Sequence, residues 1–311
     1  MLFLLIACTQ PKVMPLVEEH LLLTGQAPYK DQILPGVWET DGDFNELWRQ
    51  PLLQDQGGFG AVRVGQDTLL SRSGPPPDPN TAFDLINQDG EVIWTYDAAE
   101  AGALVFPHGV GMTPWGQYLV ADAVTSRILA IGADGKVDWI QYTAADRKGP
   151  SGFDIGIVDG QPMLVATLLD ESTTSIDTDD QVYAWWLHED GLDLAWKWPE
   201  SMDLRIASWM HGAHFQHDGS LLVSVAGLGN IVELDPATGT ELRRAPDDDR
   251  TILAFPRDAV LLANGDMIVV DAVELLRVRD PFGDFEIVDS IPAPLSYSVE
   301  RLDCNTEFCY E

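Results

Sequence analysis

Three residues in this chain combine a chemically active side chain with a shared local setting. His108 and Arg257 end the matching tripeptides Phe106-Pro107-His108 and Phe255-Pro256-Arg257, and His211 begins a similar stretch. Arginine supplies planar donors for an anion, and histidine supplies a proton or a nucleophilic nitrogen near neutral pH. We therefore interpret these residues as candidate catalytic or anion-binding groups. The alternative is structural, with each histidine bonded to neighbouring backbone and Arg257 paired with Asp258.

Two aspartates occupy a second repeated block. Val120-Ala121-Asp122-Ala123-Val124 matches Val269-Val270-Asp271-Ala272-Val273 at the same offset of 149 residues that relates His108 to Arg257. Asp122 and Asp271 are candidate ligand-binding residues, and a calcium ion is the cofactor they would suit. The alternative is a structural role, because an aspartate at the end of a strand often caps the following turn.

The spacing of His211, His214 and His217 invites a zinc reading. Alternate residues of a strand face the same side, so a regular strand would point His214 away from His211. His217 falls at the Asp218-Gly219 turn. We therefore predict no metal site here and keep His214 only as a ligand-binding candidate.

The elements that must position these residues repeat along the chain. A tight turn followed by a strand with a tryptophan or aliphatic residue recurs at intervals of 46, 45, 57, 46 and 45 residues, at Trp48, Trp94, Trp139, Trp196, Leu242 and Ile287. Asp-Gly between apolar runs indicates a hairpin. One repeat contains four strand-like runs: 108–113, 117–122, 127–131 and 136–141.

Four short strands per repeat of about 45 residues are typical of a propeller blade. The sequence predicts an all-β, six-bladed propeller of four-stranded antiparallel blades over residues 9–311, as a single domain. The first blade lacks a strand, which the run 295–299 would supply to close the ring. In such a ring the strand starts at 108, 211 and 257 share one face. The tryptophans Trp185, Trp186, Trp196 and Trp198 are expected to pack between blades.

The charge composition of the chain limits the classes of partner that it can bind. The chain has 50 acidic and 18 basic residues and a formal charge of −32. A surface this negative repels phosphate backbones, so nucleic acid is excluded as a partner. Walker, G-x-S-x-G and H-E-x-x-H motifs are absent from the sequence, which excludes the enzyme classes that depend on them.

Both ends of the chain carry cysteine. Residues 1–8 are apolar up to Cys8, and Leu5-Ile6-Ala7-Cys8 resembles a bacterial lipobox, with a start codon expected upstream. The resemblance implies lipid attachment at Cys8, a bacterial cell-envelope location and, because Thr9 follows the cysteine, the outer membrane, on its periplasmic or surface face. Cys304 and Cys309 would then remain as an even pair, which favours a disulfide in an oxidising compartment.

One stretch resembles a known family. Ser208-Trp209-Met210-His211-Gly212-Ala213, together with 218–224 and 230–235, is similar to the arylsulfotransferase-like propellers. That resemblance implies an exported six-bladed enzyme that transfers sulfate from a phenolic ester through histidine, with His211 on the channel face. The family's asparagine two positions after the histidine is replaced by Ala213, and the arginine expected near 224–227 is missing.

The sequence therefore favours a cell-envelope module that binds a small anionic or aromatic ligand, or another cell-envelope protein. The alternatives are an arylsulfotransferase-like enzyme and a calcium-dependent hydrolase or lactonase-like propeller. Convergence of His108, His211 and Arg257 on one channel mouth is what an enzyme would require.

Overall fold

The computed structural model describes eleven segments of the chain: 20–29, 32–41, 43–52, 57–73, 81–96, 102–143, 148–170, 180–200, 209–247, 252–293 and 298–302. In these segments the structure is almost entirely β. The exception is a short 3₁₀ turn, η1 (Ala226–Leu228). In the described part of the chain, no helix has the length and hydrophobicity needed to cross a membrane.

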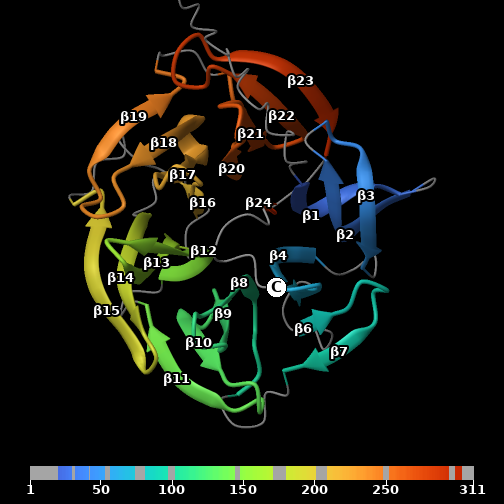
Figure 1. Cartoon of the computed structure of the whole chain (residues 1–311), viewed down its shortest axis with the longest axis vertical. Helices are drawn as coiled ribbons and strands as arrows, with labels where there is room; N and C mark the ends of the chain where they lie inside the picture. The colour runs from blue at the N-terminus through green and yellow to red at the C-terminus, as the bar shows by residue number, and fades with distance from the viewer. Residues whose placement is uncertain are drawn as a thin grey trace, which may run out of the picture.

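Six four-stranded antiparallel sheets form the blades of a ring (Figure 1). Blade 1 contains β24 (Ser298–Arg301), β1 (His20–Tyr29), β2 (Gln32–Asp41) and β3 (Glu46–Pro51), and blade 2 contains β4 (Gly57–Val64), β5 (Asp67–Ser73), β6 (Ala82–Ile86) and β7 (Val92–Thr95). Blade 3 contains β8 (Pro107–Met112), β9 (Tyr118–Asp122), β10 (Arg127–Ile131) and β11 (Val137–Tyr142), and blade 4 contains β12 (Lys148–Val158), β13 (Gln161–Asp170), β14 (Gln181–His188) and β15 (Gly191–Trp198). Blade 5 contains β16 (Met210–Phe215), β17 (Leu221–Val225), β18 (Asn230–Leu234) and β19 (Glu241–Ala245), and blade 6 contains β20 (Asp258–Leu261), β21 (Met267–Val270), β22 (Glu274–Arg279) and β23 (Glu286–Pro292).

This architecture confirms the predicted six-bladed propeller. The strands of blade 3 match the four runs read from the sequence to within one residue. Ring closure by the C-terminal strand is also confirmed, although β24 begins at Ser298 rather than at residue 295. β24 pairs with β1 in the register Leu21↔Arg301 to Thr24↔Ser298.

The hydrophobic core lies between blades. Each of six buried clusters joins residues of two consecutive blades, including blade 6 with blade 1. Middle strands such as β10 and β17 are therefore buried along their whole length. The ring is held together chiefly by burial of apolar surface between the faces of neighbouring blades.

The repeated tryptophans tie the outer edges of the blades together. Trp48, Trp139 and Trp196 each donate an indole N–H to a carbonyl in the next blade's outer hairpin turn, at Gln88, Glu189 and Pro236 respectively. Trp185 and Trp198 are buried in inter-blade clusters, and Trp186 and Trp196 pack against one. The predicted packing of these four tryptophans between blades is confirmed.

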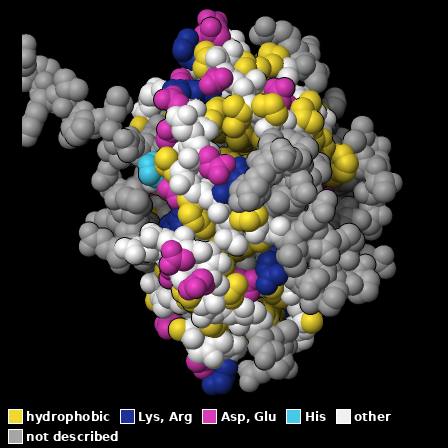
Figure 2. Space-filling view, turned by 90° about the vertical axis from the view of Figure 1, so that its right-hand side faces the viewer, with side chains coloured by type: hydrophobic (Ala, Val, Ile, Leu, Met, Phe, Trp, Pro, Cys, Tyr) yellow, Lys and Arg dark blue, Asp and Glu magenta, His cyan; other side chains and the backbone are white. Residues whose placement is uncertain are grey.

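In the side view of Figure 2, acidic side chains are dispersed among apolar and basic ones over the described surface. They do not gather into one patch on this face.

Candidate functional site

A central cavity of about 910 Å³ runs along the axis of the propeller. Its wall is formed mainly by the six innermost strands, β4, β8, β12, β16, β20 and β24 (Figure 1). It extends from the starts of these strands, where His108, Ser151 and His211 lie, to the tight turns beyond them at Gly65-Gln66 and His217–Gly219. A cavity of this size accommodates a small molecule.

A β-bulge recurs near the start of the innermost strand in blades 2 to 5. The register shifts between Gly58 and Gly60, Pro107 and Val110, Pro150 and Phe153, and Met210 and Ala213. A bulge adds one residue to a strand and re-aims the side chains around it. With one extra residue in the strand, the side chains at positions i and i+3 face the same side of the sheet.

The bulge corrects the prediction that His214 faces away from His211. Both histidines line the cavity, as does His217 at the following turn. Ser151 and Asp154 share the cavity in the same way on β12. Strict alternation fails here because it assumes a regular strand. A metal site remains unsupported, since no group of three or more potential ligands forms among the described residues.

His108, His211 and Arg257 come together at the strand starts, as the sequence predicts. His108 and His211 line the cavity, and Arg257 lies beside them, with its guanidinium 5.4 Å from the centre of the Phe255 ring. The His108 ring packs against Phe106 at 4.7 Å and the His211 ring against Phe255 at 5.3 Å. Both histidines are partly buried beside these aromatic rings.

The environment holds both imidazoles in the neutral form. Burial, with a further contribution from the charge of Arg257, lowers the pKa of His108 to about 4. Burial, then the charges of Arg257 and His108, lowers the pKa of His211 to about 3. Ser151 Oγ lies 3.4 Å from His108 Nδ1. Each neutral ring offers one N–H donor and one basic nitrogen.

The backbone of all three residues is fixed by the preceding blade. The Ser71 hydroxyl donates to the carbonyl of His108, the Thr167 hydroxyl donates to that of His211, and the Gly212 N–H donates to that of Arg257 over 2.7 Å. At His108 and His211 the bulge turns the carbonyl out of its own ladder. These bonds run from side chains of the preceding blade to the histidine backbone, and both histidines line the cavity.

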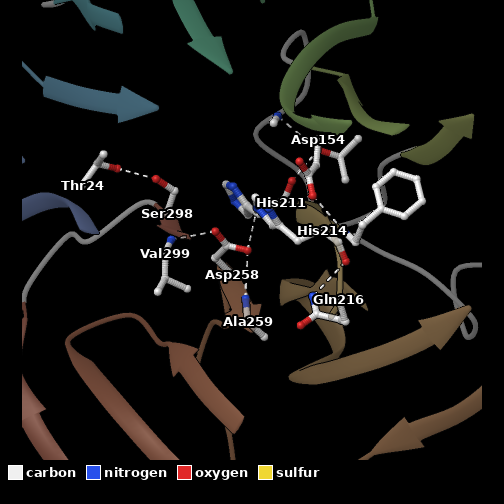
Figure 3. Close-up of polar contacts among 12 residues, drawn as sticks. Thr24, Asp154, His211, His214, Gln216, Asp258, Ala259, Ser298 and Val299 are labelled. Carbon is white, nitrogen blue, oxygen red and sulfur yellow. Dashed lines mark hydrogen bonds and ion pairs between the residues drawn. The ribbon is translucent and has the colours of Figure 1, made fainter. Parts of the chain in front are cut away.

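A second polar group in the cavity wall is centred on His214 (Figure 3). His214 Nε2 is 3.1 Å from Asp258 Oδ1, and His214 Nδ1 is 3.7 Å from Asp154 Oδ2. Burial alone would lower the pKa of His214, but the charges and hydrogen bonds of Asp258 and Asp154 outweigh it and raise that pKa well above its usual value. His214 is therefore an imidazolium between two carboxylates from β12 and β20.

Both carboxylates are anchored by backbone N–H groups. Asp258 accepts from Ala259 over 2.9 Å and, across the gap to blade 1, from Val299 over 2.9 Å. Asp154 accepts from Ile155 over 2.7 Å and from Phe215 over 2.8 Å. This belt of hydrogen bonds links blades 4, 5, 6 and 1, as Figure 3 shows.

Glu300 and Arg63 complete the deep part of the wall. Burial, followed by the negative charge of Asp154, raises the pKa of Glu300 to about 8, although His214 and Arg63 oppose the rise. Arg63 is paired with Glu39, whose other oxygen lies 2.6 Å from His20 Nδ1.

Asp122 and Asp271 have a different role from the one considered for them. Asp122 accepts from the backbone of Val105 and Phe106 and pairs with Arg127 at 3.1 Å. Asp271 accepts from the backbone of Ala254 and Phe255. Both carboxylates are buried and neither lines the cavity. Their geometry is that of matched anchors for the segments that lead into β8 and β20, and it does not support ligand or calcium binding.

The remaining sequence predictions concern the cysteines and the two positions that differ from the resembling family. Cys8, Cys304 and Cys309 lie outside the described residues. Ala213, which replaces the asparagine of the resembling family, is fully buried, and Ser224, the first residue of the stretch 224–227 near which an arginine was expected, is 1% exposed. Neither side chain supplies a group to the cavity.

The sequence reasoning missed Ser151, Asp154, Asp258, Glu300 and Arg63 as residues near or within the site. Ser151 and Asp258 could have been found, because Ser151 occupies in β12 the position that His108 and His211 occupy in their strands, and Asp258 directly follows Arg257. Asp154, Glu300 and Arg63 depend on where the bulges fall.

Neither a family model nor a curated protein matches this sequence. The fold is similar to a protein of unknown function from Bacteroides caccae, with a TM-score of 0.63 and 16% identity over 91% of this chain and 98% of that one. It is similar to a candidate 6-phosphogluconolactonase from Bacteroides fragilis, with a TM-score of 0.55 and 16% identity over 92% and 98% of the two chains. It is also similar to virginiamycin B lyase from Staphylococcus aureus, with a TM-score of 0.54 and 13% identity over 87% and 84%. At these identities the comparisons establish the propeller fold and no function.

Proposed function

We propose that this protein is a ligand-binding propeller whose central cavity takes a small organic anion at the ring of His108, His211 and Arg257. The observation that supports this most is that His108 and His211, from two separate blades, line one end of a single cavity, with Arg257 of a third blade close enough for its charge to lower the pKa of both. Their neutral imidazoles donate N–H groups and Arg257 supplies a positive field, which together suit an anionic head group.

The wall beside this ring suits an apolar body. Val110, Phe153 and Ile155 line the cavity. Gly109 and Gly111 leave room for the Phe153 ring, since a Cβ on them would lie 2.7 and 2.8 Å from it. An aromatic or aliphatic acid therefore matches the cavity better than inorganic phosphate alone.

Titration calorimetry with benzoate at pH 7 tests the proposal, and His211→Ala should weaken binding by about tenfold or more. His188→Ala is the matched control, because His188 is 49% exposed on β14, away from the cavity. Equal benzoate affinity in the wild type and His211→Ala, or absence of binding to the wild type, would refute this site.

A second candidate is an enzyme that transfers sulfate from a phenolic ester through histidine. The neutral state of His108 and His211 favours it, because only an unprotonated imidazole nitrogen is nucleophilic. A structural neighbour, virginiamycin B lyase, has been crystallised as a catalytically inactive histidine-to-alanine variant with quinupristin. The missing asparagine and arginine weigh against transfer, because each such contact to a developing anion is typically worth about 3–4 kcal/mol.

Release of p-nitrophenol from p-nitrophenyl sulfate, with phenol as acceptor, distinguishes the two candidates. The binding proposal predicts the same background rate for wild type and His211→Ala. A rate that is well above background in the wild type and is lost in His211→Ala would replace binding with transfer.

The cellular setting is a further part of the proposal. We infer export, lipid attachment at Cys8 and a place in a bacterial cell envelope, where an envelope protein could be a second partner. Membrane fractionation of wild type and Cys8→Ser tests this. The protein should leave the membrane fraction when Cys8 is replaced, and equal membrane association of the two would contradict the anchor.

A further inference from the structure

Acidic side chains are concentrated towards one end of the central cavity. At the strand starts the cavity meets His108, Ser151 and His211, with Arg257 beside them. Four of the five acidic residues in its wall lie deeper or near the tight turns, and these are Glu39, Asp89, Asp154 and Glu300. The fifth, Asp258, is the first residue of β20, next to Arg257, and its side chain reaches His214. Two cationic side chains lie in the same part of the wall, Arg63 and the imidazolium of His214.

The two regions are close enough for one small molecule to meet both. His214 follows His211 by three residues on β16, as Asp154 follows Ser151 on β12. At a rise of about 3.3 Å per residue, this offset corresponds to roughly 7–10 Å along the axis. A ring with substituents at opposite ends spans much of that length.

The deep carboxylates cannot easily turn away from a ligand. Asp154 and Asp258 each accept two backbone N–H groups and flank His214. Glu39 is paired with both Arg63 and His20. Their oxygens are therefore fixed features of the wall, and their field acts on whatever enters this part of the cavity.

Glu300 is an acidic residue of the same part of the wall that stays protonated at neutral pH. Its side chain lines the cavity, and burial together with the charge of Asp154 raises its pKa to about 8. The carboxyl retains a proton at neutral pH chiefly because it is buried, and the negative charge of Asp154 adds to the effect.

We propose that the ligand of this cavity is charge-asymmetric, with one anionic group at the His108–His211 end and a neutral or cationic group, never a second anion, at the Asp154–Glu300 end. This inference rests on the proposed anion-binding function and specifies its ligand class. The inference excludes dicarboxylates of matching length. It admits aromatic acids that carry an amino group or an amide at the other end.

Four probes of nearly the same shape test the inference by titration calorimetry at pH 7: benzoate, 4-carbamoylbenzoate, terephthalate and 4-(aminomethyl)benzoate. Terephthalate and 4-carbamoylbenzoate are isosteric and differ by one negative charge. We expect terephthalate to bind about tenfold more weakly than 4-carbamoylbenzoate, and 4-(aminomethyl)benzoate to bind at least as tightly as 4-carbamoylbenzoate.

The outcomes separate this inference from the function on which it rests. Failure of benzoate to bind would refute the anion site itself. Binding of benzoate, with terephthalate within threefold of 4-carbamoylbenzoate or with no binding of the substituted probes, would overturn the charge-asymmetric ligand and leave the anion site standing.

A variant locates the effect. Glu39→Gln removes a fixed negative charge and should bring terephthalate and 4-carbamoylbenzoate within threefold of each other, whereas Glu286→Gln on the exposed face of β23 should leave the tenfold difference intact. Asp89→Asn, at an exposed turn, replaces Glu39→Gln if that variant does not fold, as judged by circular dichroism. Undiminished discrimination in the folded variant would contradict the assignment.

Discussion

Thr167 and Ser71 do the same task for two histidines. Each hydroxyl belongs to the second strand of one blade and donates to the carbonyl of the histidine that begins the next. Thr167 Oγ1 also accepts from the Gly152 N–H over 3.3 Å. A buried hydroxyl with two roles of this kind fixes the position of the cavity-facing imidazole, although it does not itself reach the cavity.

Thr167→Val should therefore disturb His211 more than its volume suggests. The change keeps the shape but leaves the His211 carbonyl without its hydroxyl donor, which costs about 1–3 kcal/mol of unfolding free energy. Urea denaturation checks this loss, and the ring resonances of His211 in NMR should shift. Thr167→Ser should restore both, and a Val variant as stable as wild type would contradict the role.

Glu300 makes stability depend on pH in a defined direction. Its pKa in the folded protein, about 8, lies above the unfolded value of 4.5, so the folded state holds a proton that the unfolded state releases between these values. Stability is fully present below about pH 4.5 and is lost as pH rises towards 8, by up to about 1.4 kcal/mol per pH unit.

Glu300→Gln removes this proton and should be increasingly more stable than wild type as pH rises from 5 to 8. Urea denaturation at pH 5, 6.5 and 8 measures the difference, with Glu286→Gln as the surface control. A constant difference across that range would show that Glu300 is ionised in the fold.

The repeated bulge is the element that makes the site. It occurs in the innermost strands of blades 2 to 5 and brings residues three apart onto the cavity. It also brings neighbouring backbones into close approach. A Cβ on Gly60 would lie 2.4 Å from the His108 carbonyl oxygen, whereas one on Gly152 would lie 3.4 Å from that of His211.

Gly60→Ala and Gly152→Ala form a matched pair at equivalent bulge positions. We expect Gly60→Ala to force blades 2 and 3 apart and to lower the unfolding free energy by about 1–3 kcal/mol, as overpacking does. Gly152→Ala should change it by less than about 1 kcal/mol. Thermal melts compare the two, and equal destabilisation would mean that inter-blade approach does not limit these positions.

The strands were easier to predict than the bulges. Asp-Gly turns and alternating apolar residues are local signals, and they located the four strands of blade 3 to within a residue. The bulge at Met210–Ala213 leaves no comparable signal, because the groups that compensate it, such as Thr167 and Arg257, lie more than 40 residues away in sequence. For that reason the direction predicted from the sequence for the His214 side chain was wrong.

Convergence of His108, His211 and Arg257 could be predicted because it follows from the ring alone. The Asp154–His214–Asp258 belt could not, because it joins three blades through side chains whose directions depend on two bulges and on the start of β20. Asp122 and Asp271 look equally active in sequence, and only their backbone partners show that they anchor the chain.

At the scale of the whole molecule, the ring is closed by the four residues of β24. These residues pair with β1, and Val299 lies in the core cluster between blades 6 and 1. The Val299 N–H reaches Asp258 of blade 6, and the Ser298 hydroxyl meets that of Thr24 at 2.7 Å. Closure and the deep cavity wall therefore share residues.

Truncation before Ser298 should expose the edge of β1 and open the cavity. We expect the shortened chain to aggregate or to melt far below the full chain, because an unpaired sheet edge and a split core cluster are left in contact with water. Size-exclusion chromatography and thermal melts measure this. A monomeric truncated protein that melts within a few degrees of the full chain would show that blade 1 is stable without β24.

The anion site at His108, His211 and Arg257 is the central claim, and an experimental structure of the protein with 4-carbamoylbenzoate tests it most directly. The account predicts the carboxylate within hydrogen-bonding distance of His108 and His211 and the amide pointing towards Asp154 and Glu300. A ligand bound outside the central cavity, or inside it with its carboxylate among the acidic residues, would contradict the account.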